Sequence, residues 1–187
     1  KVPVTYLGPL SRFEKKAALT KFDLCIILSG PEPQRTAFEK IILTGIEKIP
    51  EKICLLRGLP QETEVPVLTN PSVEIKNHLP AAELSTIIQQ SNIVISRCGY
   101  STVMDLVKLQ KKAVLVPTPG QTEQEYLAVY LRKQKLFYSV DQEIFSLQDA
   151  LKKAEAFKYG DWPTNNDDYK MVIENFVATL QTNNAGI

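Results

Sequence analysis

The sequence has 187 residues, of which 44% are hydrophobic and 23% are charged, which is typical of one globular domain with a buried core. Its 22 basic and 21 acidic residues nearly cancel, and this balance argues against a dedicated nucleic-acid-binding protein. No apolar run approaches the roughly 20 residues of a membrane-spanning helix.

The cysteines favour a reducing compartment. Cys25 and Cys54 lie within apolar runs, as small core residues do, and Cys98 lies in a glycine turn. An odd number of cysteines without paired spacing predicts neither a disulfide framework nor a metal site, so we expect a cytoplasmic protein. No motif predicts a resident cofactor.

Apolar runs of strand length alternate with segments whose apolar residues repeat at helical spacing. In chain order, we expect a strand over 23–28, a helix over 36–48, strands over 52–58 and 73–78, a helix over 81–90, a strand over 93–96, a helix over 102–110, a strand over 113–117, a helix over 122–134, a strand over 136–140, and helices over 147–154 and 169–180. Strands that alternate with helices require right-handed crossovers and a parallel sheet. We therefore predict an α/β fold, a doubly wound parallel sheet of about six strands.

The loop after the first expected strand contains Ser29, Gly30 and, at its end, Arg35. Gly30 allows a ligand to approach the backbone closely, and Arg35 can make a two-pronged contact with phosphate oxygens. The alternative is an ordinary strand-to-helix turn with a surface arginine.

A second polar loop follows the strand over 93–96. Gly99 permits a tight turn, Ser101 and Thr102 can cap the next helix, and the amides of this loop can point at a diphosphate. Thr102 and Asp105 also match the T-x-x-D spacing of a capping box, so capping alone is the alternative for Asp105.

A third polar loop, residues 118–125, follows the strand over 113–117. Its side chains Gln121, Gln124 and Glu125 suit sugar hydroxyls, because a carboxylate accepts hydrogen bonds and a carboxamide both donates and accepts them. The alternative is a solvated first helical turn, where acidic residues complement the helix dipole.

His78, the only histidine, lies at the carboxyl end of an expected strand. It could line a nucleotide pocket in which Leu79 packs against a base. The alternative is a histidine that makes local hydrogen bonds only.

Together, these motifs resemble the C-terminal domain of family 28 glycosyltransferases. That family reads roughly R-S-G-x-x-T-x-x-E, then a strand ending in V-P, then a polar loop ending in D-x-Q-Q-Y. This chain has R-C-G-Y-S-T-V-M-D from Arg97 to Asp105, then Val116-Pro117, then E-Q-E-Y over 123–126. By these motifs it is most similar to the bacterial N-acetylglucosaminyltransferases of peptidoglycan synthesis. The similarity runs from residue 23 to about residue 140.

The resemblance implies one half of a two-domain GT-B enzyme. Residues 1–187 would form its nucleotide-sugar donor-binding domain, with 1–22 leading in from a missing N-terminal domain and 146–187 forming C-terminal helices. The N-terminal domain would bind the acceptor, supply the catalytic base and make any membrane contact. The C-terminal helix would cross back to that domain, as in the family.

The resemblance also implies the contacts of single residues. Asp105 would bind the ribose hydroxyls, and Gln124 and Glu125 would bind the sugar. The remaining donor contacts would come from Ser29, Gly30, Arg35, His78, Leu79, Arg97, Gly99, Tyr100, Ser101, Thr102 and Gln121. The chain departs from the family in three places, since Asp105 replaces Glu, Glu125 replaces Gln, and S-G-P over 29–31 replaces G-G-S.

The primary hypothesis is therefore an inverting, metal-independent hexosyltransferase that uses UDP-N-acetylglucosamine or another UDP-sugar. One alternative is a UDP-sugar hydrolase or 2-epimerase of similar fold. Another is a non-catalytic donor-binding subunit that needs a partner. We expect these 187 residues alone to bind donor without transferring sugar.

Overall fold

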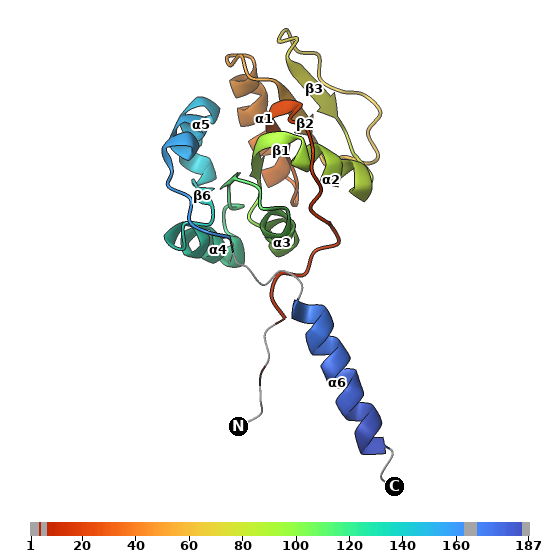
Figure 1. The fold of residues 1–187 in the computed structure, drawn as a ribbon. Helices are drawn as coiled ribbons and strands as arrows, with labels where there is room; N and C mark the ends of the chain where they lie inside the picture. The colour runs from red at the N-terminus through yellow and green to blue at the C-terminus, as the bar shows by residue number, and fades with distance from the viewer. Residues whose placement is uncertain (1–3, 5–6, 163–167, 185–187) are drawn as a thin grey trace.

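Six parallel strands form one sheet in the part of the chain that the computed structural model describes, residues 4, 7–162 and 168–184. The strand order is β3-β2-β1-β4-β5-β6, and helices cover both faces of the sheet (Figure 1). The elements in chain order are β1 (Phe22–Ile27), α1 (Gln34–Ile46), β2 (Ile53–Leu56), β3 (Val73–Lys76), α2 (Ala81–Gln89), β4 (Ser91–Ser96), α3 (Tyr100–Leu109), β5 (Ala113–Leu115), α4 (Thr122–Lys133), β6 (Tyr138–Ser139), the 3-10 turn η1 (Gln142–Ile144), α5 (Leu147–Ala156) and α6 (Asp168–Asn184).

The predicted doubly wound α/β fold is confirmed, with its strands near their expected positions. Several boundaries differ from expectation by a few residues, and two of these differences have a local cause. The helix α3 begins at Tyr100, two residues before the predicted start, because Gly99 serves as its N-cap. The strand β2 ends at Leu56, because Gly58 turns the chain with a φ of +70°.

Side chains alternate along each strand and pack into two hydrophobic cores, one on each face of the sheet. On one face, the core contains Cys25, Cys54 and Val94 together with residues of α2, α3 and α4. On the other face, it contains Ile26 and Ile95 together with residues of α1 and α5. Because both faces are covered, the strands are continuous apolar runs, as in other parallel sheets.

The N-terminal segment before β1 lies along α2 and α3. The ring of Phe13 is buried in the core on that face, with 4% of it exposed. The amide of Lys16 donates to Gln89 Oε1 at 2.5 Å, and Lys15 Nζ donates to Gln110 Oε1. Residues 13–16, which belong to the segment predicted only as a lead-in from another domain, thus contribute to the packing of this one.

The helix α6 extends away from the sheet and the other helices (Figure 1). Large apolar side chains are exposed on it, namely those of Met171, Ile173, Phe176, Val177 and Leu180. Among the described residues, no helix combines the length and the hydropathy needed to cross a bilayer.

Candidate functional site

Three strand-to-helix junctions meet at the carboxyl edge of the sheet. Ile27 of β1 pairs with Ser96 of β4, and Ser96 pairs with Leu115 of β5, so these three strands end side by side. The chain reverses its direction of winding between β1 and β4. Ligands of open α/β sheets bind at such a switch point.

The helices that follow these strands present their N-termini to this edge. In α1, α3 and α4, the N-cap residues Pro33, Gly99 and Gln121 make no side-chain capping hydrogen bond. In α1 the neighbouring Glu32 partly compensates, because its Oε2 accepts from the amide of Thr36 at 3.1 Å. Helix N-termini with unpaired N–H groups attract anions, phosphates above all.

The N-terminus of α3 is open at its N-cap. A Cβ placed on Gly99 would meet no atom within 4 Å beyond its chain neighbours. Tyr100 and Ser101 are exposed and Thr102 is half-buried at the first turn. The alternative that Thr102 and Asp105 form a capping box is wrong, because Gly99 is the N-cap and no side chain caps this helix.

Asp105 lies farther along α3 and is half-buried. Its Oδ1 accepts a hydrogen bond from Ser11 Oγ at 2.5 Å. Burial raises the pKa of Asp105, although the bond from Ser11 and the charge of Arg12 act in the opposite direction. The carboxylate therefore faces the N-terminal segment and is held by a hydroxyl, which is also the kind of group that a ribose offers.

The predicted sugar-binding residues hold the loop between β5 and α4. Gln124 Oε1 accepts from the amide of Thr118 at 3.0 Å, and its Nε2 donates to Gln121 Oε1 at 2.5 Å. Glu125 Oε1 accepts from the amide of Gly120 at 2.9 Å. The structure thus brings Gln121, Gln124 and Glu125 together and leaves Glu125 exposed.

The loops after β1 and β5 approach each other closely. A Cβ on Gly30, which has a φ of +103°, would lie 3.7 Å from Thr118 Oγ1. Thr118 is 1% exposed, and its Oγ1 has no hydrogen-bond partner among the described residues. Ser29, which precedes Gly30 in the chain, is half-buried. Sequence reasoning missed Thr118, although its position after the V-P at the end of a strand was a usable signal.

Arg97 is buried, contrary to the expectation of a donor contact. Only 2% of it is exposed, and burial lowers the pKa of its guanidinium to about 10. Its Nη2 donates to Gln142 Oε1 at 2.6 Å, so its guanidinium is bonded within the protein. Neither the burial of Arg97 nor the role of Gln142 has a signal in the sequence.

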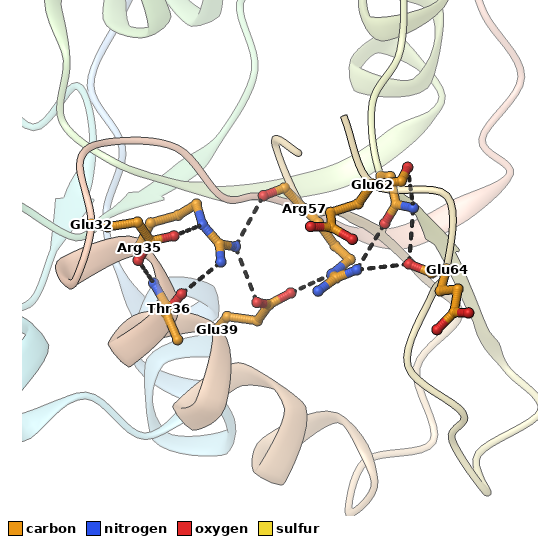
Figure 2. A network of polar contacts seen from close by, with 8 residues as sticks. Glu32, Arg35, Thr36, Glu39, Arg57, Glu62 and Glu64 are labelled. Atoms are coloured by element: carbon orange, nitrogen blue, oxygen red, sulfur yellow. Dashed lines mark hydrogen bonds and ion pairs between the residues drawn. The ribbon is translucent and has the colours of Figure 1, made fainter. Parts of the chain in front are cut away.

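The guanidinium of Arg35 is likewise bonded within the protein, to two carboxylates (Figure 2). Its Nε donates to Glu32 Oε1 at 2.6 Å and its Nη1 to Glu39 Oε2 at 3.0 Å. Glu39 also accepts from Arg57 Nε at 2.5 Å, and Arg57 reaches Asn77 Oδ1 at 2.9 Å. Glu39 and Arg35 are buried, so this network fixes the start of α1 to the ends of β2 and β3. A phosphate contact from Arg35 would require these ion pairs to break.

His78 and Leu79 lie apart from the three junctions. They follow β3, the edge strand, which β2 and β1 separate from β4. His78 is exposed, whereas Leu79 is partly buried against the core on the α2 and α3 face. Their contact with a nucleotide base stays a prediction.

Comparisons with known proteins agree with this architecture. Residues 48–167, more than half of the chain, match the family model of the glycosyltransferase family 28 C-terminal domain. The sequence matches none of the curated proteins.

Several solved structures share the fold at low sequence identity. The glycotransferase of kitacinnamycin superposes with a TM-score of 0.58 at 15% identity, over 91% of this chain and 43% of that one. The glycosyltransferase VinC, in complex with DTDP, gives 0.53 at 11% identity, over 87% and 39%. ALG13 gives 0.51 at 16% identity, over 85% and 95%. The chain thus spans less than half the length of the first two proteins and nearly all of the third.

Proposed function

The chain belongs to the glycosyltransferase family 28 C-terminal domain family, and we propose that it is the donor-binding half of a hexosyltransferase. The proposed donor is UDP-N-acetylglucosamine or another UDP-sugar. One observation carries this proposal: α1, α3 and α4 direct their N-termini to the same edge of the sheet, where β1, β4 and β5 end in register. VinC, a protein of similar fold, was solved with a nucleoside diphosphate, which supports this ligand class.

In the proposed reaction, an acceptor hydroxyl attacks the anomeric carbon of the donor while the bond to the diphosphate breaks. The departing diphosphate gains negative charge, and helix N-termini stabilise such charge without reorganisation. The base that takes the acceptor proton comes from an N-terminal domain outside this chain. The 187 residues alone therefore bind donor and transfer nothing.

In this proposal, Asp105 accepts hydrogen bonds from the ribose. The second oxygen of Glu125 and the second N–H of Gln124 are available to sugar hydroxyls. Glu125 uses only Oε1 in its contact with Gly120, and Gln124 uses its oxygen and one N–H in its contacts with Thr118 and Gln121. Gly30 and the first turn of α3 face the diphosphate.

The proposed partner is an acceptor-binding N-terminal domain. The chain covers only 43% and 39% of two glycosyltransferases that share its fold, which leaves room for such a domain. The exposed apolar residues of α6, such as Phe176 and Leu180, suit a contact with it. Any membrane contact would be made through that domain. The three cysteines are free and buried, which supports a cytoplasmic location.

A second candidate is a donor-binding subunit that works with a separate partner chain. The observation that favours it is the likeness to ALG13, which this chain covers over 95% of its length. Sequencing the gene upstream of Lys1 separates the two candidates, since a continuous reading frame that encodes a second domain favours the two-domain enzyme.

Isothermal titration calorimetry tests the donor-binding proposal. The protein is titrated with UDP, dTDP, UDP-N-acetylglucosamine and uridine, with adenosine as the control nucleoside. We expect UDP to bind and to bind more tightly than uridine, because only UDP carries the diphosphate. The absence of binding by every nucleotide at millimolar concentration would overturn the proposal.

A further inference from the structure

The guanidinium of Arg97 is buried and bonded almost entirely to backbone oxygens. Its Nη1 donates to the carbonyls of Val116 and Pro117 at 3.3 and 3.2 Å. Its Nη2 donates to the carbonyl of Gln34 at 2.9 Å and to Gln142 Oε1 at 2.6 Å. Arginine is rarely buried without a partner of opposite charge. Among the described residues, no carboxylate forms an ion pair with Arg97.

These partners belong to the segments that form the proposed site. Arg97 begins the loop between β4 and α3, and the two carbonyls on Nη1 belong to the loop between β5 and α4. Gln34 is the first residue of α1, and Gln142 lies in η1. Gln142 Nε2 in turn donates to Gln34 Oε1 at 3.2 Å. One side chain therefore connects the three loops that follow β1, β4 and β5.

The guanidinium is also fixed from one side by an aromatic ring. Its Cζ lies 4.4 Å from the centre of the Phe38 ring. A planar fork with five fixed donors can bond several carbonyls at once, which an ammonium group on a flexible stem cannot do in the same geometry. Burial of this charge is costly, and the carbonyl bonds that offset the cost also fix the distances between the loops.

We propose that Arg97 is a positioning residue of the donor site, holding the loops after β1, β4 and β5 at the spacing that lets their amides face one diphosphate. The inference rests on the proposed donor binding, and it assigns Arg97 a place behind the loops, out of contact with the ligand. The unpartnered Nε is buried as well, so a phosphate cannot reach it without rearrangement of the loops.

NMR titrations of the 187-residue chain with UDP and with uridine test this inference. In Arg97→Lys and Arg97→Met, we expect UDP affinity to fall about tenfold while uridine affinity stays within about twofold. Lysine keeps the positive charge of Arg97. A loss of UDP affinity in both variants would therefore show that the planar guanidinium group is needed, and not the charge alone. Two results in folded variants would overturn the inference. One is UDP affinity equal to that of the wild type, and the other is a loss of uridine affinity as large as the loss of UDP affinity.

Arg132→Met is the matched control. Arg132 also donates to a backbone carbonyl, that of Ser139 at 3.1 Å, and lies over an aromatic ring, that of Tyr138 at 5.0 Å. It is exposed on α4, and among the described residues its side chain makes no hydrogen bond to the three loops. We expect Arg132→Met to leave both affinities unchanged, and a loss of UDP binding in it equal to that of Arg97→Met would contradict the proposed role.

A second variant and a measurement without nucleotide keep the test decisive if Arg97 variants do not fold. Gln142→Met removes one acceptor of Arg97 and leaves its charge in place. We expect amide hydrogen exchange of Thr118 and Gly120 to accelerate in free Gln142→Met protein, because Arg97, which anchors the loop after β5, loses one of the acceptors that hold it in place. Unchanged exchange would overturn the positioning role. Failure of wild-type protein to bind UDP would instead overturn the proposed function, so the two failures are distinguishable.

Discussion

The carboxylate of Asp105 accepts a hydrogen bond of 2.5 Å from the hydroxyl of Ser11, across 94 positions of sequence. Ser11 Oγ also accepts from the amide of Phe13 at 3.0 Å, and the ring of Phe13 is buried in the core. The N-terminal segment thus holds the residue that we propose for ribose binding. A ribose hydroxyl would either join Ser11 on this carboxylate or replace it.

Replacement of Asp105 by alanine should weaken UDP binding more than pyrophosphate binding. UDP loses an acceptor for its ribose hydroxyls, worth about 1–3 kcal/mol when the partner group is left unpaired, whereas pyrophosphate has no ribose. Calorimetry with both ligands measures the difference. The control is Asp149→Ala, which removes an exposed carboxylate on α5 that pairs with Lys153. Equal losses for UDP and pyrophosphate would refute the ribose contact.

Replacement of Ser11 by alanine should raise the pKa of Asp105 further. Burial already raises this pKa, and the hydrogen bond from Ser11 lowers it. A carboxyl whose pKa is higher in the folded than in the unfolded protein favours folding at low pH, and this contribution is lost as the pH rises through the folded pKa. Ser11→Ala should therefore destabilise the protein more at pH 7 than at pH 3, which are about the two limits of this titration.

The Ser11 prediction is measured by carbon-detected NMR titration of the Asp105 carboxyl group and by urea unfolding at both pH values. Ser101→Ala, an exposed serine of the same helix, is the control and should leave the pKa of Asp105 unchanged. An Asp105 pKa that is identical in wild type and Ser11→Ala would show that this hydrogen bond has no electrostatic effect.

Gly99→Ala should impair ligand binding and leave folding intact. Gly99 has an ordinary φ of −79°, and a Cβ there meets no atom within 4 Å beyond its neighbours. The methyl group would instead occupy the space in front of the α3 amides. We expect UDP affinity to fall, with the free energy of unfolding changed by no more than about 0.5 kcal/mol.

Gly58→Ala is the matched contrast. Gly58 has a φ of +70°, and its Cβ would lie 2.4 Å from the carbonyl oxygen of Leu28. We expect this variant to lose about 1–3 kcal/mol of stability. Urea unfolding and calorimetry of both variants separate the two effects, and a Gly99→Ala protein that binds UDP like wild type would place the diphosphate elsewhere.

Glu39→Gln should strongly destabilise the protein. Glu39 is buried between Arg35 and Arg57, and its removal leaves two guanidinium groups without their shared carboxylate (Figure 2). Loss of one partner from a buried ion pair costs about 3–5 kcal/mol. The control, Glu32→Gln, alters an exposed carboxylate that also bonds Arg35 and should change stability much less. Equal losses of stability in urea unfolding would mean that burial of Glu39 is unimportant.

The fold could be predicted well from the sequence, because the patterns that specify strands and helices lie within short segments of the chain. Runs such as the apolar stretch of β1 specify strands covered on both faces, and helical spacing in α1 and α4 specifies the crossovers between them. The position of the proposed site follows from the same pattern, since the carboxyl ends of parallel strands must lie at one edge. The family assignment came from the motifs between Arg97 and Tyr126, and the match over 48–167 confirms it.

The orientation of long polar side chains could not be predicted in the same way. Arg35 was predicted as a phosphate ligand and Arg97 as a donor contact, yet Arg97 turns inward toward carbonyls and Arg35 toward Glu39. Partners far away in sequence decide such conformations, and nothing local distinguishes them. The bond between Ser11 and Asp105 was hidden for the same reason.

The burial of Phe13 has a practical consequence for dividing this chain. A fragment that started at β1 would retain every strand and helix of the sheet but lose the ring that fills part of its interior beside α2 and α3. Such a truncated product would carry a hole in its hydrophobic centre and a bare carboxylate at Asp105. A cloning boundary chosen by secondary structure alone would therefore cut into the folded unit itself.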